Sequence, residues 1–208
     1  MVTEGRGGAE AARLQELWSG EFGDEYTERN AEAGQGREPF WDGLLGRYEI
    51  ERVLEVGCNV GANLQWIAPR LAPGKTFGVD VNVGALARLR ERVPTVNAVT
   101  ADARELPFRD GWFDLSFTTG VLIHQAPEAL PAVMGELVRV SRRYVLCGEY
   151  FAEEPTEVPY RNVPGALFKR DFGQLYLDLF PDLRLVETGT LDRTQGWDDV
   201  TWWLFEKG

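Results

Sequence analysis

The sequence VLEVGCNVGAN, residues 53–63, runs from a short apolar strand directly into a glycine-rich turn. In open α/β sheets, ligands bind outside the carboxyl ends of the strands, so this turn is the natural place for one. A dinucleotide fingerprint would need glycine at position 59, but Asn59 stands there, and its side chain would obstruct a pyrophosphate. The turn therefore predicts a nucleoside ligand without phosphate, and a tight turn that binds no ligand is the alternative.

Strand and helix patterns alternate around this turn. Short β-branched runs separate stretches with helical spacing of apolar residues, which is typical of a parallel sheet with helices on both faces. The last two strands leave no room for a helix between them, so they must pair antiparallel. We therefore expect an α/β, Rossmann-like, seven-stranded, mostly parallel sheet with an antiparallel last strand. The predicted strands are 52–56, 76–80, 95–100, 112–118, 144–150, 183–191 and 200–207, and the predicted helices are 62–71, 83–93, 127–141 and 170–180.

The two ends of the chain differ from this alternating core. An apolar stripe at Leu14, Leu17 and Trp18 predicts a short amphipathic helix over 10–19, and a turn-rich segment follows over 20–30. The prolines of residues 151–167 predict a long loop, which in a compact domain is usually functional or disordered. We expect one domain over 1–208, with an N-terminal helix and lid in 1–40, a cofactor-binding core in 41–150, and an acceptor loop, helix and terminal hairpin in 151–208.

The charge and composition exclude several functional classes. The 208 residues carry a formal net charge of −11, which argues against nucleic acid or an anionic membrane as a partner, because phosphates select basic faces. With one histidine and two cysteines, a metal site built on several such ligands is excluded, and no metal is expected. No apolar run suits a spanning helix or an export signal, which favours the cytoplasm. The expected partner is a small molecule, bound by a monomer or a homodimer.

Carboxylates end the second and third predicted strands. Asp80 lies about 20 residues past the glycine turn, where an acidic residue accepts hydrogen bonds from ribose hydroxyls. Its alternative role is to cap the next helix, although Asn82 is better placed for that. Asp102 is either an acceptor for an adenine amino group or a solvated loop aspartate.

These residues, at these spacings, resemble the class I S-adenosylmethionine-dependent methyltransferases over residues 50–150. Glu55, Gly57 and Gly61 stand at positions of that superfamily's first motif. Asp80 stands at its ribose-binding acidic residue, and Asp102 stands at the residue that meets adenine. The resemblance implies S-adenosylmethionine as cofactor and S-adenosylhomocysteine as product. Three further residues at the strand ends are assigned to cofactor binding: Asn59, Ala103 and Thr119.

A narrower resemblance, over nearly the whole chain, is carried by WSGEFGDEYTERN (18–30), GCNVGAN (57–63), GVLIH (120–124), EY (149–150), EVPYR (157–161), LFKRDF (167–172) and DDVTWW (198–203). These segments are similar to the pseudaminic acid biosynthesis-associated methylases. The resemblance implies a small, free-standing methyltransferase linked to biosynthetic clusters. The family name reflects an association with sugar pathways and does not fix the methyl acceptor.

Three residues after the fourth and fifth strands are candidate catalytic residues. In-line methyl transfer requires the protein to hold the acceptor close to the methyl carbon and to manage one proton. His124 has an unperturbed pKa near neutrality, so as a base it would give a rate that rises with pH through about 6–7. The alternative for His124 is a loop hydrogen bond or packing on the cofactor. The alternative for Glu149 and Tyr150 is a helix-cap or loop contact.

The cations of the long loop are candidates for binding the acceptor. Arginine suits bidentate recognition of carboxylate or phosphate, so Arg161, Lys169 and Arg170 predict an anionic group on the acceptor. Tyr160, next to Arg161, is assigned to the same site. The alternative is that the cations form surface ion pairs with Glu153, Glu154, Glu157 or Asp171.

The N-terminal segment offers a cover for the cofactor. Tyr26 and Arg29, three residues apart, are candidates to close over it as a lid. The alternative is that Tyr26 packs in the core and Arg29 is a solvated charge.

The sequence predicts an enzyme that transfers a methyl group from S-adenosylmethionine to oxygen or nitrogen of a small, polar, anionic metabolite in a biosynthetic pathway. A nicotinamide-dependent oxidoreductase on a similar sheet is an alternative, although Asn59 and the antiparallel terminal pair speak against it. A module that binds a nucleoside without chemistry is another, although His124 and Arg161 favour an enzyme.

Overall fold

The computed structural model describes residues 4–208 and contains, over that range, a seven-stranded sheet. Its strands are β1 (Val53–Val56), β2 (Thr76–Asp80), β3 (Asn97–Thr100), β4 (Phe113–Thr119), β5 (Ser141–Glu149), β8 (Leu183–Leu191) and β9 (Val200–Lys207). Their order is β3-β2-β1-β4-β5-β9-β8. Strands β1 to β5 are parallel, and β9 pairs antiparallel with both β5 and β8. The predicted fold class is confirmed.

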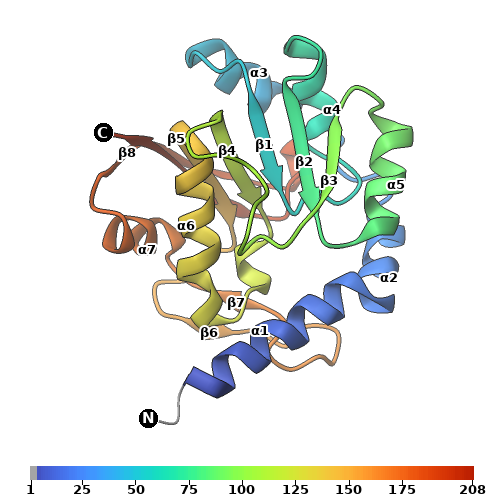
Figure 1. Ribbon diagram of the computed structural model, residues 1–208, viewed down its shortest axis with the longest axis vertical. Helices are drawn as coiled ribbons and strands as arrows, with labels where there is room; N and C mark the ends of the chain where they lie inside the picture. Colours follow the sequence, from blue (N-terminus) through green and yellow to red (C-terminus); the bar gives the residue numbers. More distant parts are fainter. Residues whose placement is uncertain (1–3) are drawn as a thin grey trace.

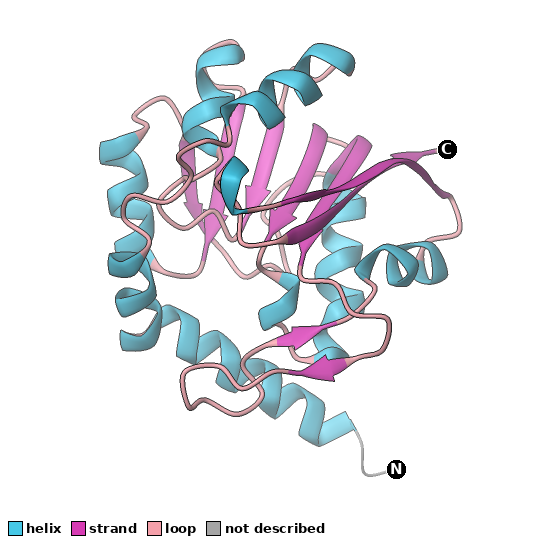
Figure 2. Cartoon of the chain, turned by 180° about the vertical axis from the view of Figure 1, so that it is seen from behind, coloured by secondary structure: helices cyan, strands magenta, loops and turns pink. Residues whose placement is uncertain are grey.

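Helices cover both faces of the sheet (Figures 1 and 2). Successive side chains of a strand point to opposite faces, so Val53 and Leu54 of β1 belong to two different apolar cores. Helix α4 is shorter than the predicted helix over 62–71, because Pro69 has no N–H to continue it and a 3-10 turn (Ala68–Arg70) follows. One core includes α3 (Glu38–Arg47), α4 (Leu64–Ile67) and α5 (Val83–Arg92), and the other includes α6 (Leu130–Val140) and α7 (Phe172–Leu179).

The N-terminal segment differs from the prediction. Helix α1 (Glu4–Ser19) begins earlier than expected, and α2 (Glu21–Arg29) replaces the predicted turn-rich segment. Acidic Glu21 in the first turn of α2 and basic Arg29 in the last turn both suit the helix dipole. Gly23 lets α2 approach α1, because a Cβ there would lie 1.9 Å from the carbonyl oxygen of Trp18. The glycines that suggested turns therefore allow close packing of helices.

The long loop over 151–167 is held at both ends. Strands β6 (Thr156–Glu157) and β7 (Phe168–Lys169) pair antiparallel, and Val158 donates its N–H to the carbonyl of Leu167 at 2.9 Å. Arg13 of α1 donates to the carbonyl of Pro164 at 3.0 Å. The loop is thereby fixed against α1.

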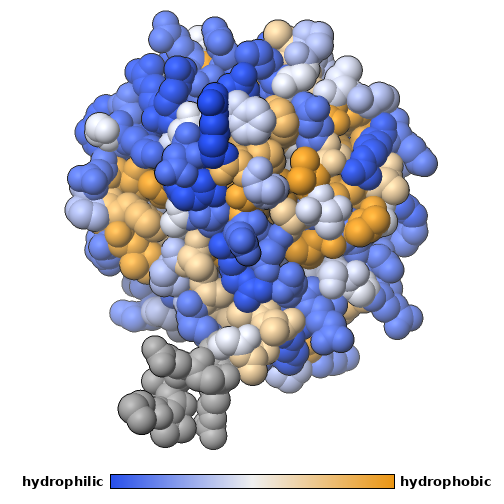
Figure 3. Space-filling view, in the orientation of Figure 1, coloured by the Kyte–Doolittle hydropathy of each residue, from blue (hydrophilic) through white to orange (hydrophobic). Residues whose placement is uncertain are grey.

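The carboxyl ends of the central strands point toward α1 and α2, as Figure 1 shows. Short 3-10 helices, Leu122–His124 and Pro127–Ala129, connect β4 to α6 on this side of the molecule. The face drawn in Figure 3 is mostly hydrophilic, with smaller apolar patches between the polar side chains. Within residues 4–208, no helix has the length and apolar character needed to cross a membrane.

Candidate active site

A cavity of about 700 Å³ lies between the carboxyl ends of the strands, the α1–α2 pair and the long loop. Most residues selected from the sequence line it, whereas Gly61, Glu149 and Arg170 do not. Those that line it are Tyr26, Arg29, Glu55, Gly57, Asn59, Asp80, Asp102, Ala103, Thr119, His124, Tyr150, Tyr160, Arg161 and Lys169.

Both glycines of the turn after β1 have backbone conformations that other residues rarely adopt. Gly57 has φ 73°, and a Cβ there would lie 2.3 Å from a methyl carbon of Val121. Gly61 has φ 78°, and a Cβ there would lie 2.4 Å from Leu89 of α5. Gly57 therefore shapes the cavity wall, while Gly61 serves the packing of the turn on α5 and does not line the cavity.

Asp80 and Asn59 meet at the centre of this wall. The Asp80 carboxylate accepts the N–H of Asn59 at 2.8 Å and that of Asn82 at 2.9 Å, and burial raises its pKa. Asn59 has φ 43°, and its amide donates to the hydroxyl of Thr27 on α2 at 3.1 Å. The Asn59 side chain therefore joins the turn to α2. The helix cap falls to Asn82, which accepts the N–H of Ala85.

The neighbouring wall, after β3, carries Asp102 and Ala103. Arg104 donates to both carboxylate oxygens of Asp102, with Nε at 3.0 and 3.1 Å. Burial acts to raise the pKa of Asp102, but the hydrogen bonds and charge of Arg104 outweigh it and lower the pKa. Arg104 also donates to Gln15 of α1 at 2.6 Å, so this wall is tied to the covering helix.

Glu55 is buried at the base of the cavity with one unpaired oxygen. Asn63 donates to its Oε1 at 2.6 Å and to the Thr119 hydroxyl at 2.9 Å, while Oε2 has no partner. Burial raises the pKa of Glu55 to about 8 despite the hydrogen bond from Asn63. The guanidinium of Arg37 donates to Asn63 Oδ1 at 3.0 Å and lies 4.1 Å from the ring centre of Trp197.

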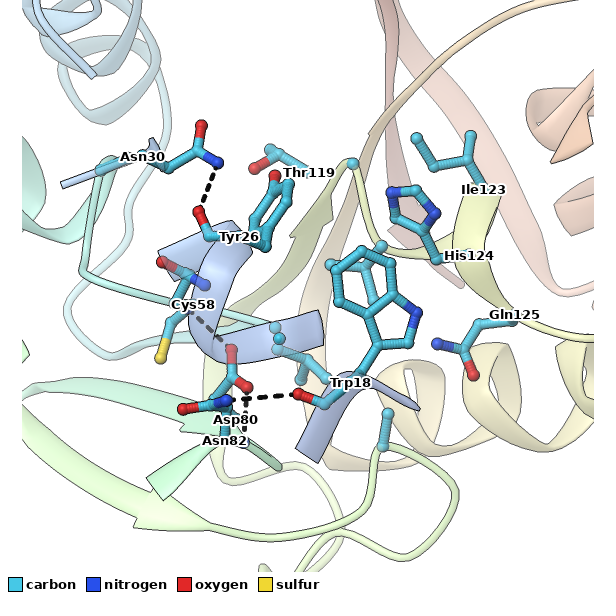
Figure 4. A pocket seen from close by; sticks show the side chains of 18 of the residues that line it. Trp18, Tyr26, Asn30, Cys58, Asp80, Asn82, Thr119, Ile123, His124 and Gln125 are labelled. Atoms are coloured by element: carbon cyan, nitrogen blue, oxygen red, sulfur yellow. Dashed lines mark hydrogen bonds between the residues drawn. The ribbon is translucent and has the colours of Figure 1, made fainter. Parts of the chain in front are cut away.

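His124 has its protonation fixed by the long loop. Its Nδ1 lies 2.5 Å from the carbonyl oxygen of Ala166, which can only accept, so Nδ1 carries the proton. Nε2 is then an acceptor, and it has no hydrogen-bond partner within the described residues. Burial lowers the pKa of His124 to about 4, so the expected inflection at 6–7 does not belong to this residue. Figure 4 shows the Trp18 indole beside the imidazole, and their ring centres are 4.5 Å apart.

Glu149 is not in the position expected of a catalytic residue. Its carboxylate is buried behind the cavity wall and accepts the N–H groups of Val121, Leu122 and Ile123 at 3.1, 3.1 and 3.3 Å. The loop contact weighed as its alternative is therefore what the structure shows. Burial raises the pKa of Glu149 to about 7.

Three tyrosines surround the cavity. Tyr26 comes from α2, Tyr150 follows β5, and Tyr160 lies in the long loop with its ring centre 5.2 Å from that of His124. Burial raises the pKa of Tyr150 to about 12 and also raises that of Tyr26, so both hydroxyls stay protonated at neutral pH. Arg29 reaches the cavity while bonded to Glu25 at 3.3 Å.

The loop cations divide into two groups. The Nζ of Lys169 lies 5.5 Å from the ring centre of Tyr150, and the guanidinium of Arg161 lies 5.9 Å from that of Tyr160. Arg170 lies outside the cavity against Phe172, which does not fit its expected role in substrate binding. None of the three belongs to an ion pair found among residues 4–208, so the surface pairing considered from the sequence is not observed.

Sequence reasoning missed part of the cavity wall. Arg37 stands in a glycine-rich stretch with no motif around it, and Trp197 lies between the last two strands. Trp18 was recognised in an apolar stripe and in the segment WSGEFGDEYTERN (18–30), but not as a residue of the cavity. Among the described residues, no three His, Cys, Asp or Glu side chains are grouped to hold a metal ion.

The cavity fits a polar nucleoside-type ligand. Three buried polar atoms of lining residues have no partner: the indole nitrogens of Trp18 and Trp197, which donate, and Oε2 of Glu55. Buried polar groups are nearly always hydrogen-bonded, so unpaired ones on residues that line a cavity are consistent with a ligand that supplies partners after small side-chain shifts. Asp80 adds an acceptor at the position expected for a ribose.

Comparison with known proteins finds similarity to methyltransferases. Residues 53–143 match the family described as a methyltransferase domain. The chain is 34% identical over 97 residues to a phthiotriol/phenolphthiotriol dimycocerosates methyltransferase of Mycobacterium tuberculosis, a match covering 44% of this chain and 34% of that protein. It is 32% identical over 126 residues to a malonyl-acyl-carrier-protein O-methyltransferase of Halorhodospira halophila, a match covering 57% of this chain and 42% of that protein. The matched part of the chain thus spans 34% and 42% of the lengths of these two relatives.

A solved structure shows the same architecture. Magnesium protoporphyrin IX methyltransferase from Synechocystis, with bound S-adenosylhomocysteine, superposes with a TM-score of 0.70 at 16% identity, covering 95% of this chain and 99% of that one. The family match covers residues 53–143, and the shared fold extends over nearly the whole chain. The same Synechocystis enzyme has also been solved with bound S-adenosylmethionine, and that structure superposes with a TM-score of 0.69.

Proposed function

We propose that the chain transfers the methyl group of S-adenosylmethionine to a hydroxyl or amino group of a small, polar, anionic metabolite in a biosynthetic pathway. The observation that carries this proposal is the fixed protonation of His124. Its Nδ1–H is held by the Ala166 carbonyl, which leaves Nε2 as an acceptor toward the cavity. The resemblance to the pseudaminic acid biosynthesis-associated methylases supports the biosynthetic role.

The residues that line the cavity indicate which side chains would bind the cofactor. Asp80 would accept from the ribose hydroxyls, and the Asp102 and Ala103 wall would hold the adenine end. Glu55 and Arg37 offer a carboxylate and a guanidinium to the charged ends of the amino-acid part. The cofactor supplies a methyl group on a positively charged sulfur.

His124 would manage the proton of the acceptor. A neutral imidazole with a pKa of about 4 is a weak base, but its lone pair accepts a hydrogen bond from a hydroxyl or amine and orients that group. The acceptor atom becomes strongly acidic as its new bond forms, so even a weak base takes the proton. Because His124 is neutral throughout the physiological range, this step needs no prior deprotonation of the histidine.

The same geometry disfavours a carboxylate acceptor. A carboxylate has only lone pairs to present to Nε2, whereas a hydroxyl or amine presents an N–H or O–H. The anionic part of the metabolite belongs instead near Lys169 and Arg161, which line the cavity without carboxylate partners in the described chain. The Trp18 indole N–H, beside His124, is a further donor to it.

Transfer from methyl-labelled S-adenosylmethionine tests the proposal. The protein is incubated with a panel of hydroxy acids, amino acids and sugar acids, and each labelled product is treated with mild alkali. A methyl ether or methylamine survives this treatment, whereas a methyl ester is hydrolysed. We expect an alkali-stable product, which His124→Ala reduces strongly. An alkali-labile product would show that the acceptor is a carboxylate and would overturn the role given to His124.

A further inference from the structure

Glu149 links three parts of the active site without touching the cavity. It ends β5, is fully buried, and uses both carboxylate oxygens to accept three consecutive backbone N–H groups, those of residues 121–123. Oε1 accepts two of them, and Oε2 accepts the third. A carboxylate with three such bonds sets both the position and the orientation of the turn.

The turn that Glu149 holds carries much of the site. Val121 packs against Gly57 so closely that a Cβ on the glycine would overlap it, at 2.3 Å. Ile123 and His124 line the cavity, and His124 reaches across to the carbonyl of Ala166 in the long loop. Any shift of residues 121–124 therefore moves the glycine turn, the histidine and the acceptor loop relative to one another.

We propose that Glu149 is the positioning residue of methyl transfer, because its carboxylate holds the turn 121–124 and thereby aims His124 at the acceptor. The inference rests on the function proposed above. Glu149 acts through His124 and is separated from substrate by the cavity wall. The residue selected from the sequence as catalytic thus has an indirect role.

Protonation weakens this hold, because only the oxygen that stays unprotonated remains a full acceptor. A carboxylate accepts at both oxygens, but a carboxylic acid carries an O–H, which is a donor facing N–H donors. The titratable groups near Glu149 are Cys147 of β5, Tyr150 and Tyr176 of α7, and burial raises the pKa of all three. None of them is a cation, so the three N–H groups and the side chain of Thr118 are what stabilise the carboxylate against burial. This agrees with a pKa raised to about 7.

The rate should consequently depend on pH through Glu149 and not through His124. Above about pH 7 the carboxylate holds the turn, and below it the turn loosens. A fall of kcat at low pH, measured at saturating cofactor and called the acidic limb here, would normally be assigned to protonation of the histidine beside the acceptor. Here His124 is neutral on both sides of that limb.

A pH titration of the whole protein by NMR, with S-adenosylhomocysteine bound, tests the contact directly. We expect the backbone amide signals of residues 121–123 to shift together with a midpoint near 7. The Glu149→Gln variant, which carries a donor where the acid would, should lack this transition. Glu91→Gln, an exposed carboxylate of α5, is the matched control and should retain it. Amide signals that stay constant between pH 5 and 9 in the unaltered protein would overturn the proposal, even if Glu149→Gln does not fold.

Kinetics with the acceptor found in the labelled panel test the positioning role. Glu149→Gln should lower kcat about 10- to 100-fold, as expected for a small displacement of a reacting group, and should remove the acidic limb. The affinity for S-adenosylhomocysteine should change less than about threefold, because that ligand contacts other walls. His124→Gln should lower kcat and keep the limb. If the acidic limb of kcat survives in Glu149→Gln and disappears in His124→Gln, the inference is refuted. If no labelled product forms, the proposed function is refuted. In that case the titration of the backbone amides still tests whether Glu149 holds the turn.

Discussion

Glu55 carries a buried carboxylate whose charge depends on what fills the cavity. Without a ligand its pKa is about 8, so it is mostly protonated at pH 7. An ammonium group placed against the unpaired Oε2 stabilises the ionised form, so binding should release a proton. We expect the affinity for S-adenosylhomocysteine to rise by up to about tenfold per pH unit toward pH 8, and to level off above it.

Calorimetry in two buffers of different ionisation enthalpy measures this proton release. Glu55→Gln cannot release a proton and should bind S-adenosylhomocysteine more weakly, with an affinity independent of pH. An equal proton release from the variant would show that another group titrates.

His124 permits a second test at this scale. His124→Ala removes the acceptor Nε2 and the contact with the Ala166 carbonyl, so kcat should fall by about 10²–10⁴-fold. The affinity for S-adenosylhomocysteine should stay nearly constant. His124→Asn is informative because its amide can donate or accept but cannot take a proton at neutral pH, and it should be nearly as slow. A fully active Asn variant would mean that the imidazole only packs against its neighbours.

At the scale of elements, the loop between β5 and α7 separates cations that look equivalent in sequence. Lys169 and Arg161 line the cavity, and Arg170 does not. Lys169→Glu and Arg161→Glu should therefore raise the KM for an anionic acceptor at least about tenfold, by replacing attraction with repulsion. Arg170→Gln is the comparison, and it should leave KM unchanged. A similar KM increase in all three variants would indicate a general effect of net charge.

The α1–α2 pair should respond to cofactor binding as a unit. Side-chain hydrogen bonds join it to the cavity walls, among them Asn82 to Asp24 at 2.8 Å, Asn59 to Thr27 at 3.1 Å and Arg104 to Gln15 at 2.6 Å. A ligand that contacts both the walls and this pair adds to these contacts and raises the free energy of local opening. Trypsin cleavage after Arg29 should therefore slow several-fold with S-adenosylhomocysteine present, whereas cleavage after the exposed Arg184 should not. Equal slowing at both sites would remove the lid interpretation.

The sheet was predictable because its signals are local. Apolar runs such as 113–119 predict strands, and the glycines at 57 and 61 predict the turn that follows the first strand. The order of the elements along the chain then restricts the topology of the sheet. The helix α2 was not predictable from composition, because Gly23 serves a contact with Trp18 that exists only once α1 has formed. Arg37 was missed for a similar reason. Its role comes from Asn63 and Trp197, which lie far from it in sequence.

For the whole molecule, buried titratable groups set the dependence of stability on pH. Glu55 and Glu149 have pKa values raised by burial to about 8 and about 7, so the folded state holds protons that the unfolded chain has lost. Their contribution is complete below the unfolded pKa near 4.5 and is lost as pH rises through the folded values. His124, lowered to about 4, works in the opposite direction, but only below its unfolded pKa of 6.5.

The free energy of unfolding should therefore fall between about pH 6.5 and 8, where the two carboxyl groups act without opposition from His124. Scanning calorimetry of the ligand-free protein should show Tm decreasing over this range. The double variant Glu55→Gln, Glu149→Gln, which mimics the protonated state of both groups, should have a flatter profile. A wild-type Tm that rises over this range would contradict the assignment.

The hydrogen bond from Asn59 to Thr27 ties the glycine turn to the helix that covers it. Asn59 also donates its N–H to Asp80, which would bind the ribose. Asn59 therefore connects Asp80 to the helix α2 that covers the cavity. We expect the product S-adenosylhomocysteine to leave only after α2 moves away, and α2 is bonded to the wall that we propose binds this product. We therefore expect product release to limit turnover as much as the chemical step does, so removing the bond between Asn59 and Thr27 should shorten the residence time of the product before it slows methyl transfer.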